Sequence, residues 1–266
     1  MRARIFLSAC LSLAFSVGLG AINDANAAET LSFRRGSSCS LAISGISAAV
    51  EAPLELETEL PSDPMKREKA LAFDGERKVF ASERTPQIEQ QIAKMQAIQK
   101  LRLRLMHQEL KERGMRVSSF RLVRSLADEV SAVGFGLYVV FENGVQDLMG
   151  SISYQTYGTR EETISFRVDV APRFRKLGVS TFLAAASIED NPQTERIDSS
   201  LTESNILIFQ RGLQMGLTPT EALARTPAMK LRRALGYSID LDLSTVPNSD
   251  SDPVLEVIAV RDDLLQ

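Results

Sequence analysis

The feature that most constrains the fold is a succession of strand-like segments in the middle of the chain. Residues 133–141 are rich in β-branched and aromatic side chains, and residues 163–170 alternate apolar and polar side chains, as a half-buried strand does. Asn143-Gly144 is a preferred turn of tight hairpins, and residues 148–157 supply the return strand. The sequence therefore predicts a meander of three antiparallel strands.

A long amphipathic helix is predicted over residues 86–113, before the strands. Its apolar side chains recur three or four residues apart, on one helical face: Ile88, Ile92, Met95, Ile98, Leu101 and Leu105. Gly114 stands where a helix C-terminus takes a left-handed residue, and a first candidate strand follows at 117–122. His107 lies within this helix, where a solvated side chain is a simpler interpretation than a catalytic one.

Charge and composition exclude several classes of function. The net charge of −3 lacks the basic surplus of a nucleic-acid binder. The chain holds one histidine, so a zinc site built on histidines is not expected, and a Ser-His-Asp triad has only His107 as its base. We therefore expect no metal and no nucleic-acid partner.

The turn after residues 163–170 carries a predicted phosphate site. Pro172 ends the strand, since a proline donates no backbone hydrogen bond, and a helix begins near Gly178. Free N–H groups and the positive dipole end at a helix N-terminus bind phosphate, and a glycine lets the ligand approach closely. Basic side chains lie at the same place: Arg173, Arg175 and Lys176. The alternative is an ordinary strand-to-helix turn with basic residues present by chance.

This turn resembles the pyrophosphate motif of the GNAT N-acyltransferase superfamily, V-x-P-x-(Y/F)-R-x-x-G-(V/I)-(G/A)-x-x-L. The chain reads Val170-Ala171-Pro172-Arg173-Phe174-Arg175-Lys176-Leu177-Gly178-Val179-Ser180-Thr181-Phe182-Leu183. Every motif position is matched except Ser180, where the family has Gly or Ala. The string follows a strand meander and precedes an apolar helix, as in the family.

The order of segments downstream also resembles this family. Residues 196–201 form a plausible next strand, residues 228–237 resemble the family's A-x-x-L-Y-x-x-L-G-(F/Y) helix and turn, and residues 254–260 would close the sheet. The resemblance covers about residues 131–262. It implies an α/β (α+β) fold: a mixed, mainly antiparallel sheet flanked by helices, with an N-terminal helical extension.

The resemblance implies acyl transfer from acetyl-CoA, or another acyl-CoA, to a small-molecule or protein amine. Backbone amides of residues 176–181 would hold the pyrophosphate, and strand 166–170 would pair with the pantetheine arm. Asn205 stands where the family has an Asn near that arm. The cofactor-binding residues expected from the resemblance are Val168, Val170, Arg175, Lys176, Leu177, Gly178, Val179, Ser180, Thr181 and Asn205.

Two catalytic positions follow from the same comparison. The tyrosine that often protonates the departing thiolate in the family falls at Arg232, which can stabilise a thiolate electrostatically but not act as a general acid. A general base must accept a proton from the amine. Asp169 is our first choice because it alternates with two apolar residues of its strand, and the other carboxylates considered are Glu161, Glu162, Asp198 and Glu203. An inserted segment at 206–227, with a helix over 206–214, could reshape or block the acceptor site.

The first 27 residues have the layout of a secretory signal peptide. Arg2 and Arg4 precede an apolar run to about Ala21, and a small-x-small pattern ends at Ala27. We expect cleavage there and a periplasmic or secreted protein with no stable membrane span; an uncleaved anchor is the alternative. Because acyl-CoA is cytoplasmic, the protein could be a secreted effector, use another donor, or be an inactive GNAT-fold binding module.

The remaining chain divides into three predicted parts. Residues 28–85 form a tether or loosely ordered extension in which prolines interrupt any helix, with a short hairpin possible at Asp74-Gly75. Residues 86–130 hold the long helix and first strand, and residues 131–266 form the GNAT-like acyltransferase domain.

Overall fold

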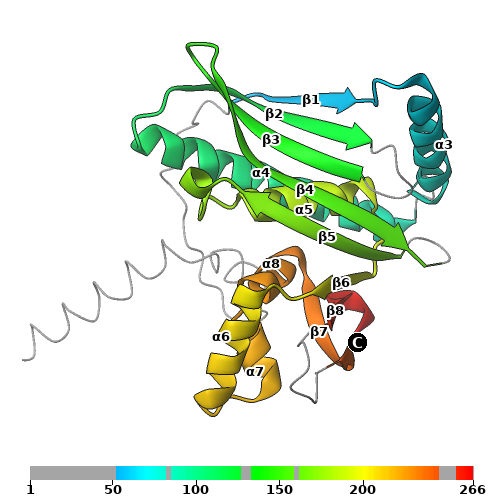
Figure 1. The fold of residues 1–266 in the computed structure, drawn as a ribbon, viewed down its shortest axis with the longest axis vertical. Helices are drawn as coiled ribbons and strands as arrows, with labels where there is room; N and C mark the ends of the chain where they lie inside the picture. Colours follow the sequence, from blue (N-terminus) through cyan, green and yellow to red (C-terminus); the bar gives the residue numbers. More distant parts are fainter. Residues whose placement is uncertain (1–51, 82–84, 127–132, 159–161, 246–255, 266) are drawn as a thin grey trace, which may run out of the picture. The chain divides into compact units, whose positions relative to one another are not determined.

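The computed structural model describes residues 52–81, 85–126, 133–158, 162–245 and 256–265, all within one compact unit that begins at residue 48. Figure 1 shows the elements in chain order. The strands are β1 (Leu54–Glu59), β2 (Val117–Leu126), β3 (Val133–Phe141), β4 (Gln146–Tyr157), β5 (Thr163–Val170), β6 (Arg196–Ser200), β7 (Tyr237–Thr245) and β8 (Glu256–Arg261). The helices are α3 (Pro64–Ala81), α4 (Pro86–Glu112), α5 (Val179–Asp190), α6 (Glu203–Gln214), α7 (Pro219–Ala224) and α8 (Pro227–Leu235).

The described strands form a single mixed sheet in the order β1-β2-β3-β4-β5-β6-β8-β7. Strands β2 to β5 are an antiparallel meander, and the two parallel pairs are β1 with β2 and β5 with β6. The three predicted meander strands and the mixed, mainly antiparallel fold class are therefore confirmed. Strand β7 and helix α7 were not predicted.

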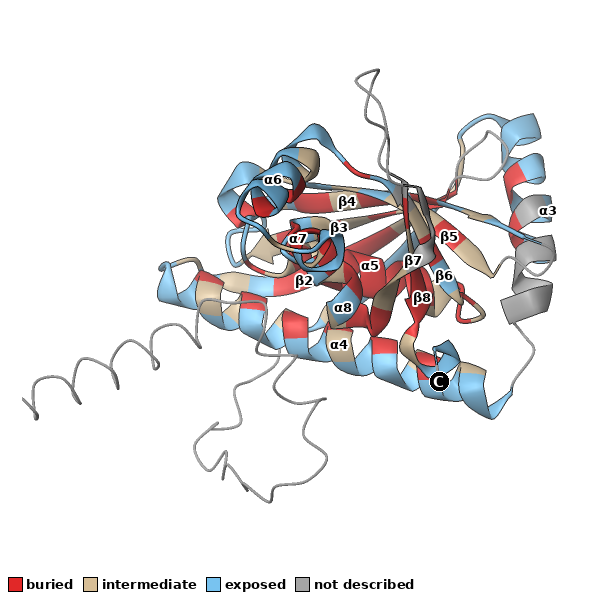
Figure 2. Cartoon of the chain, turned by 90° about the horizontal axis from the view of Figure 1, so that it is seen from below, coloured by how far each residue is buried: buried red, intermediate tan, exposed pale blue. Residues whose placement is uncertain are grey.

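Helices α4 and α5 lie together against one face of the sheet (Figure 1). Helix α4 begins where Thr85 accepts a hydrogen bond of 3.2 Å from the Ile88 N–H, and Gly114 follows it in the left-handed conformation at φ 76°. Helix α5 is buried almost all round, as Figure 2 shows, because small alanines in its middle let it sit closely between α4 and the sheet. The main core is centred on this helix, so the position of its N-terminus is well fixed.

A second, smaller core holds the segment between β6 and β7. Helices α6, α7 and α8 enclose it together with β8 and the residue that follows β6. Its buried apolar side chains are Leu201, Phe209, Ala222, Leu223, Met229 and Val257. The extra helix predicted over 206–214 is confirmed as α6, and α7 follows it with a capping box between Thr218 and Glu221. The inserted segment is thus a packed unit beside the sheet rather than a long loop.

The expected hairpin at Asp74-Gly75 is wrong, because both residues lie inside helix α3. The helix begins where Asp63 accepts hydrogen bonds from the N–H groups of Met65 and Lys66, at 2.9 and 3.2 Å. Asp74 is 5% exposed and binds a cation of β2 in place of forming a turn. The extension is also more ordered than predicted, since Leu54–Glu59 pairs with β2 in parallel.

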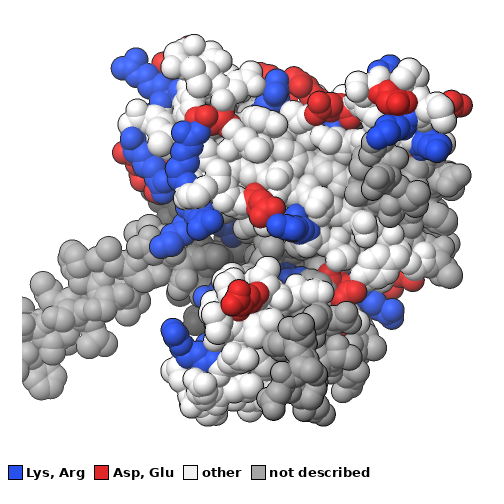
Figure 3. All heavy atoms as spheres, in the orientation of Figure 1, with Lys and Arg blue, Asp and Glu red and all other residues white. Residues whose placement is uncertain are grey.

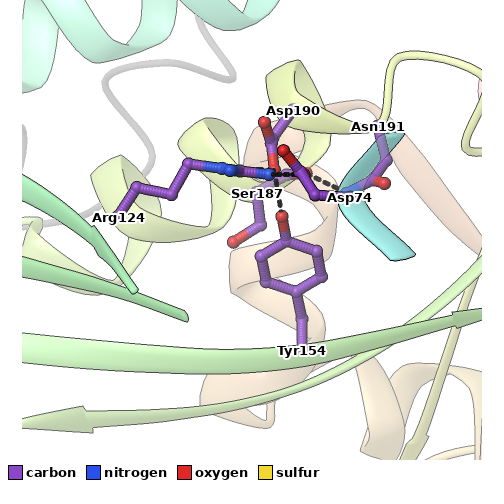
Figure 4. A network of polar contacts seen from close by, with 6 residues as sticks. All are labelled: Asp74, Arg124, Tyr154, Ser187, Asp190 and Asn191. Atoms are coloured by element: carbon purple, nitrogen blue, oxygen red, sulfur yellow. Dashed lines mark hydrogen bonds and ion pairs between the residues drawn. The ribbon is translucent and has the colours of Figure 1, made fainter. Parts of the chain in front are cut away.

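A buried polar network joins α3, β2, β4 and the C-terminal end of α5 (Figure 4). The Arg124 guanidinium donates to Asp74 at 2.5 Å and to Asp190 at 3.0 Å, and the Tyr154 hydroxyl donates to the same Asp190 carboxylate. Burial opposes the charge of Arg124, but the hydrogen bond to Asp74 and the charge of Asp190 outweigh it and raise the pKa of Arg124. Arg124 therefore links β2 to α3 and to α5, and Tyr154 of β4 joins the network through the Asp190 carboxylate.

Several predictions fall on residues that the structure does not describe. The signal peptide at 1–27, residues 28–51 and 82–84 of the proposed tether, and Glu161 lie outside the described ranges. Within those ranges, no helix has the length and apolar character needed to cross a membrane, and no three of the His, Cys, Asp and Glu side chains are grouped to hold a metal ion.

Candidate functional site

Strands β5 and β6 separate after a short stretch of pairing and leave a cleft. Only residues 163–165 of β5 pair with residues 196–198 of β6, so in the described chain residues 166–170 have no sheet partner on that side. The cleft has a volume of about 1030 Å³ and is bounded by β5, by the starts of α5 and α6, and by α8. An extended ligand can therefore pair with a free strand edge inside a hollow of the size used for cofactors.

The turn between β5 and α5 has the backbone that a phosphate cradle requires. A short 3-10 turn covers Pro172–Phe174, and Lys176 and Gly178 then adopt positive φ angles of 67° and 85°. Gly178 is the N-cap of α5 and supplies no side-chain cap, so the N–H groups of the first turn are left without that partner. Arg175 and Ser180, at the two ends of the turn, line the cleft.

The predicted binding residues divide according to what they can offer a ligand. The side chains of Leu177, Val179 and Thr181 are buried, so these residues can present only backbone groups. Val168 and Val170 are half-buried and line the cleft. The predicted cradle therefore relies on backbone N–H groups, with side-chain charge supplied by its neighbours.

The basic residues of the turn have different roles. Arg173 forms an ion pair with Asp147 and lies over the Phe174 ring, while its carbonyl accepts a hydrogen bond of 3.2 Å from Arg113 of α4. Arg175 and Lys176 are exposed and, within the described residues, form no ion pair. Figure 3 shows Lys and Arg side chains gathered over the side of the molecule where α4 ends and this turn lies. Arg173 thus secures the turn, and Arg175 and Lys176 remain for a ligand.

Arg232 of α8 brings a buried cation to the cleft wall. Its guanidinium donates to the Ala228 carbonyl at 2.8 Å and lies 5.6 Å from the centre of the Phe166 ring. Burial lowers the pKa of Arg232 to about 10, against the opposing effect of the Asp198 carboxylate. The side chain is therefore charged at neutral pH and lines the cleft, while its catalytic role stays a prediction.

Asn205 lies in the cleft wall, where its amide joins two helices. Its Oδ1 accepts a hydrogen bond of 3.2 Å from the Ala228 N–H in the first turn of α8, and its Nδ2 donates to Thr202 Oγ1 at 2.7 Å. These contacts fix the start of α6 against the start of α8. Contact of Asn205 with a ligand stays a prediction, and it would use the second N–H of the amide.

The described candidate bases are exposed or half-buried. Asp169 lines the cleft, but its side chain is 73% exposed and lies 3.5 Å from Arg167, which is 83% exposed. Asp198 accepts a hydrogen bond of 2.6 Å from the Tyr157 hydroxyl and is half-buried. Glu203 is exposed in the first turn of α6, and Glu162 is half-buried just before β5. Among the described residues that line the cleft, Asp169 is the one carboxylate.

One charged residue at the cradle was missed by the sequence argument. Arg102 of α4 is buried, and a Cβ added to Gly178 would lie 2.9 Å from its Cδ. Arg102 lies on the buried face of the helix with Met95, Gln99 and Met106. The apolar spacing predicted a different face, since Leu101 and Leu105 are 38% and 40% exposed. A buried arginine calls for a partner at the surface against which the helix packs.

No protein-family model and no curated protein matches this chain. Among solved structures, it is similar to a GCN5-related N-acetyltransferase from Kribbella flavida, at 16% identity and TM-score 0.30 over 48% of this chain and 67% of that one. It is also similar to yncA from Salmonella typhimurium, solved with its cofactor acetyl-CoA, at 14% identity and TM-score 0.30 over 48% of this chain and 62% of that one.

A third structure of this kind is a mutant form of the spermidine/spermine N-acetyltransferase SpeG from Vibrio cholerae. The identity is 12% and the TM-score 0.31, over 50% of this chain and 66% of that one. The match thus covers less than two thirds of yncA and of SpeG. Likeness of this degree carries no information about activity, which depends on the residues of the cleft.

Proposed function

We propose that this protein is an acyltransferase that moves an acyl group, such as acetyl, from acyl-CoA to an amine. The observation that carries the proposal is the cleft between β5 and β6. A strand edge at 166–170, without a sheet partner in the described chain, leads directly to the N-terminus of α5. The edge can pair with an extended pantetheine arm while the helix N-terminus meets the phosphates.

The residues of the turn fit the phosphate end of such a donor. Gly178 leaves the backbone open to close approach, and its φ of 85° orients the first turn of α5 without a capping side chain. Arg175 and Lys176 add two exposed positive charges at the same turn. The arrangement suits a ligand with several negative charges, which CoA provides.

At the other end of the cleft, the departing thiolate would be stabilised by a positive charge rather than by proton donation. A bound acyl-CoA supplies an activated thioester that an amine can attack directly. Arg232 stays protonated at neutral pH, so it can stabilise negative charge on a departing sulfur but does not supply a proton there. Asp169 is the cleft carboxylate that can accept a proton from the amine, directly or through water.

The second candidate function is a GNAT-fold binding module without catalysis. The observation that favours it is the exposure of Asp169 beside Arg167, because a carboxylate that is 73% exposed is not held in position to accept a proton from a substrate. Export, which the first 27 residues predict, favours it too, since acyl-CoA is a cytoplasmic compound. Both functions require the same phosphate cradle and differ only in turnover.

Calorimetric titration with CoA and acetyl-CoA tests the cradle, and release of free thiol in the presence of an amine panel tests turnover. We expect Gly178→Asp to abolish CoA binding, because the new side chain adds a negative charge and its Cβ would lie 2.9 Å from Arg102 Cδ at a positive φ. Absence of CoA binding to the wild-type chain would sink the proposal. Binding without thiol release would establish the binding module instead.

Gly144→Asp is the matched control for the cradle substitution. Gly144 has a similar φ of 79°, and a Cβ there would meet nothing within 4 Å. It therefore carries the same backbone strain and the same added charge, away from α5. CoA affinity should be unchanged in Gly144→Asp, so a loss of binding in both variants would count against a specific cradle.

A further inference from the structure

Arg102 is a buried cation placed at the start of helix α5. It belongs to α4, is 8% exposed, and lies against Gly178, the N-cap of α5. A Cβ built on Gly178 would be 2.9 Å from Arg102 Cδ and 3.5 Å from its Nη1. The missing side chain of Gly178 is therefore what lets the arginine approach the cradle.

This guanidinium has no partner among the described residues. The Gln99 amide, three residues before it on the same buried face, is engaged elsewhere, since it donates to Glu189 at 2.5 Å. The guanidinium nitrogens of Arg102 are not among the fully enclosed atoms that lack a hydrogen bond, so they keep contact with solvent. A buried arginine is normally paired, and this one remains accessible to a ligand.

An unpaired Arg102 guanidinium is energetically unfavourable at the N-terminus of α5. The N-terminus of a helix carries partial positive charge, so a cation there is disfavoured. Burial acts in the same direction and lowers the pKa of the Arg102 guanidinium. Arg175 and Lys176 add further positive charge at the same turn. A bound anion would relieve all of these effects together.

We propose that Arg102 is a phosphate-binding residue, whose guanidinium shares one phosphate group of the ligand with the free N–H groups at the start of α5. The planar fork of arginine suits two parallel hydrogen bonds to phosphate oxygens. The proposal rests on the proposed function for the identity of the ligand as an acyl-CoA. It extends the binding site to α4, a helix that lies between β1 and β2 in the chain, and favours donors that carry phosphates.

Titration calorimetry with two probes, CoA and inorganic pyrophosphate, tests this role in the full chain. We expect Arg102→Met to weaken binding of both by roughly 30-fold or more, the loss typical of truncating one partner of a buried charge pair. Arg102→Lys keeps the charge without the fork and should recover part of the affinity. Lys111→Met removes an exposed charge from the same helix and should change affinity less than about threefold.

The outcomes separate this proposal from the proposed function. Equal CoA affinity in wild type and Arg102→Met would overturn the role of Arg102 and leave the donor site standing. Pyrophosphate binding that depends on Arg102, without CoA binding, would support the anion site and overturn the acyl-CoA function. If the wild-type chain binds neither probe, both are wrong. The melting temperature of ligand-free Arg102→Met should equal or exceed that of wild type, which distinguishes lost binding from lost folding.

Discussion

Each end of helix α5 carries side chains of the charge that the helix dipole disfavours there. The two ends differ in whether other groups of the chain pair with that charge. Glu189 and Asp190 lie at the C-terminal end, where negative side chains are unfavourable. Arg124 and the Tyr154 hydroxyl bind Asp190, and the amides of Gln96 and Gln99 donate to Glu189 at 2.7 and 2.5 Å. That end is satisfied by the chain itself.

The N-terminal end of α5 has the opposite arrangement. Arg102, Arg175 and Lys176 gather there, where positive side chains are unfavourable, and no carboxylate of the described residues pairs with them. The chain does place carboxylates on nearby cations, since Asp147 binds Arg173 and Glu109 binds Arg113. Arg102, Arg175 and Lys176 are thus left without a carboxylate in a region where neighbouring cations have one.

The difference indicates which end is built for stability and which for binding. At the C-terminal end, removal of the cation should leave buried carboxylates without a neutralising positive charge. At the N-terminal end, removal of a cation should relieve repulsion and reduce the affinity for an anion. The same type of substitution, arginine to methionine, should therefore have opposite effects on stability at the two ends.

Arg124→Met should give the largest effect on folding. The Arg124 side chain is 11% exposed and serves Asp74 and Asp190, whose side chains are 7% and 18% exposed. Removing one partner of a buried pair costs about 3–5 kcal/mol, because the remaining charges stay buried. Denaturant unfolding of both variants measures the contrast: Arg124→Met should lose this free energy of unfolding, and Arg102→Met should lose none.

Arg121→Met is the control on the same strand. Its side chain is 26% exposed, and its partner Glu57, 3.7 Å away, is 50% exposed. A surface pair of this kind contributes about 0–1 kcal/mol. If Arg124→Met costs no more than Arg121→Met, the C-terminal end of α5 is not held by the buried cation, and the comparison between the two ends fails.

Tyr154→Phe should have an intermediate effect. The Tyr154 hydroxyl donates to Asp190 and is buried within β4, but Asp190 keeps its bond to Arg124 in the variant. A hydrogen bond to a charged group contributes roughly 1.5–3 kcal/mol, so we expect a loss near the lower value. Tyr138→Phe on β3, whose ring faces Arg121, is the control and should change the unfolding free energy by less than about 0.5 kcal/mol.

The fold was largely predictable where the local pattern is strong. Strands β3 and β5, the start of α5 at Gly178 and the extent of α4 follow from alternation, helical spacing and turn residues, which act locally. The segment 54–59 was predicted to belong to a tether, because it is acidic and the prolines around it interrupt any helix. It forms a strand because β2 offers a parallel edge, and that partner is distant in sequence.

The site was predictable only in its backbone. The motif placed Arg175, Gly178 and Ser180 correctly at the turn beside the cleft. Arg102 could not be assigned to the cradle, because its contact with Gly178 depends on how α4 packs against α5, across more than seventy residues of sequence. Asp74 shows the same limit, since a local Asp-Gly turn signal was overruled by an ion pair with a residue on β2.

Glu189→Gln should give the smallest effect and the finest test of the comparison. The change removes a negative charge from the unfavourable end of α5, which should stabilise the helix by about 0.3–1 kcal/mol. It also places an amide NH₂ opposite one of the two glutamine donors, which costs a hydrogen bond of about 1 kcal/mol. These opposing changes should leave the unfolding free energy within about 0.5 kcal/mol of wild type. A loss of 2 kcal/mol or more would mean that the glutamine pair depends on the charge, so that each acid at this end is individually required.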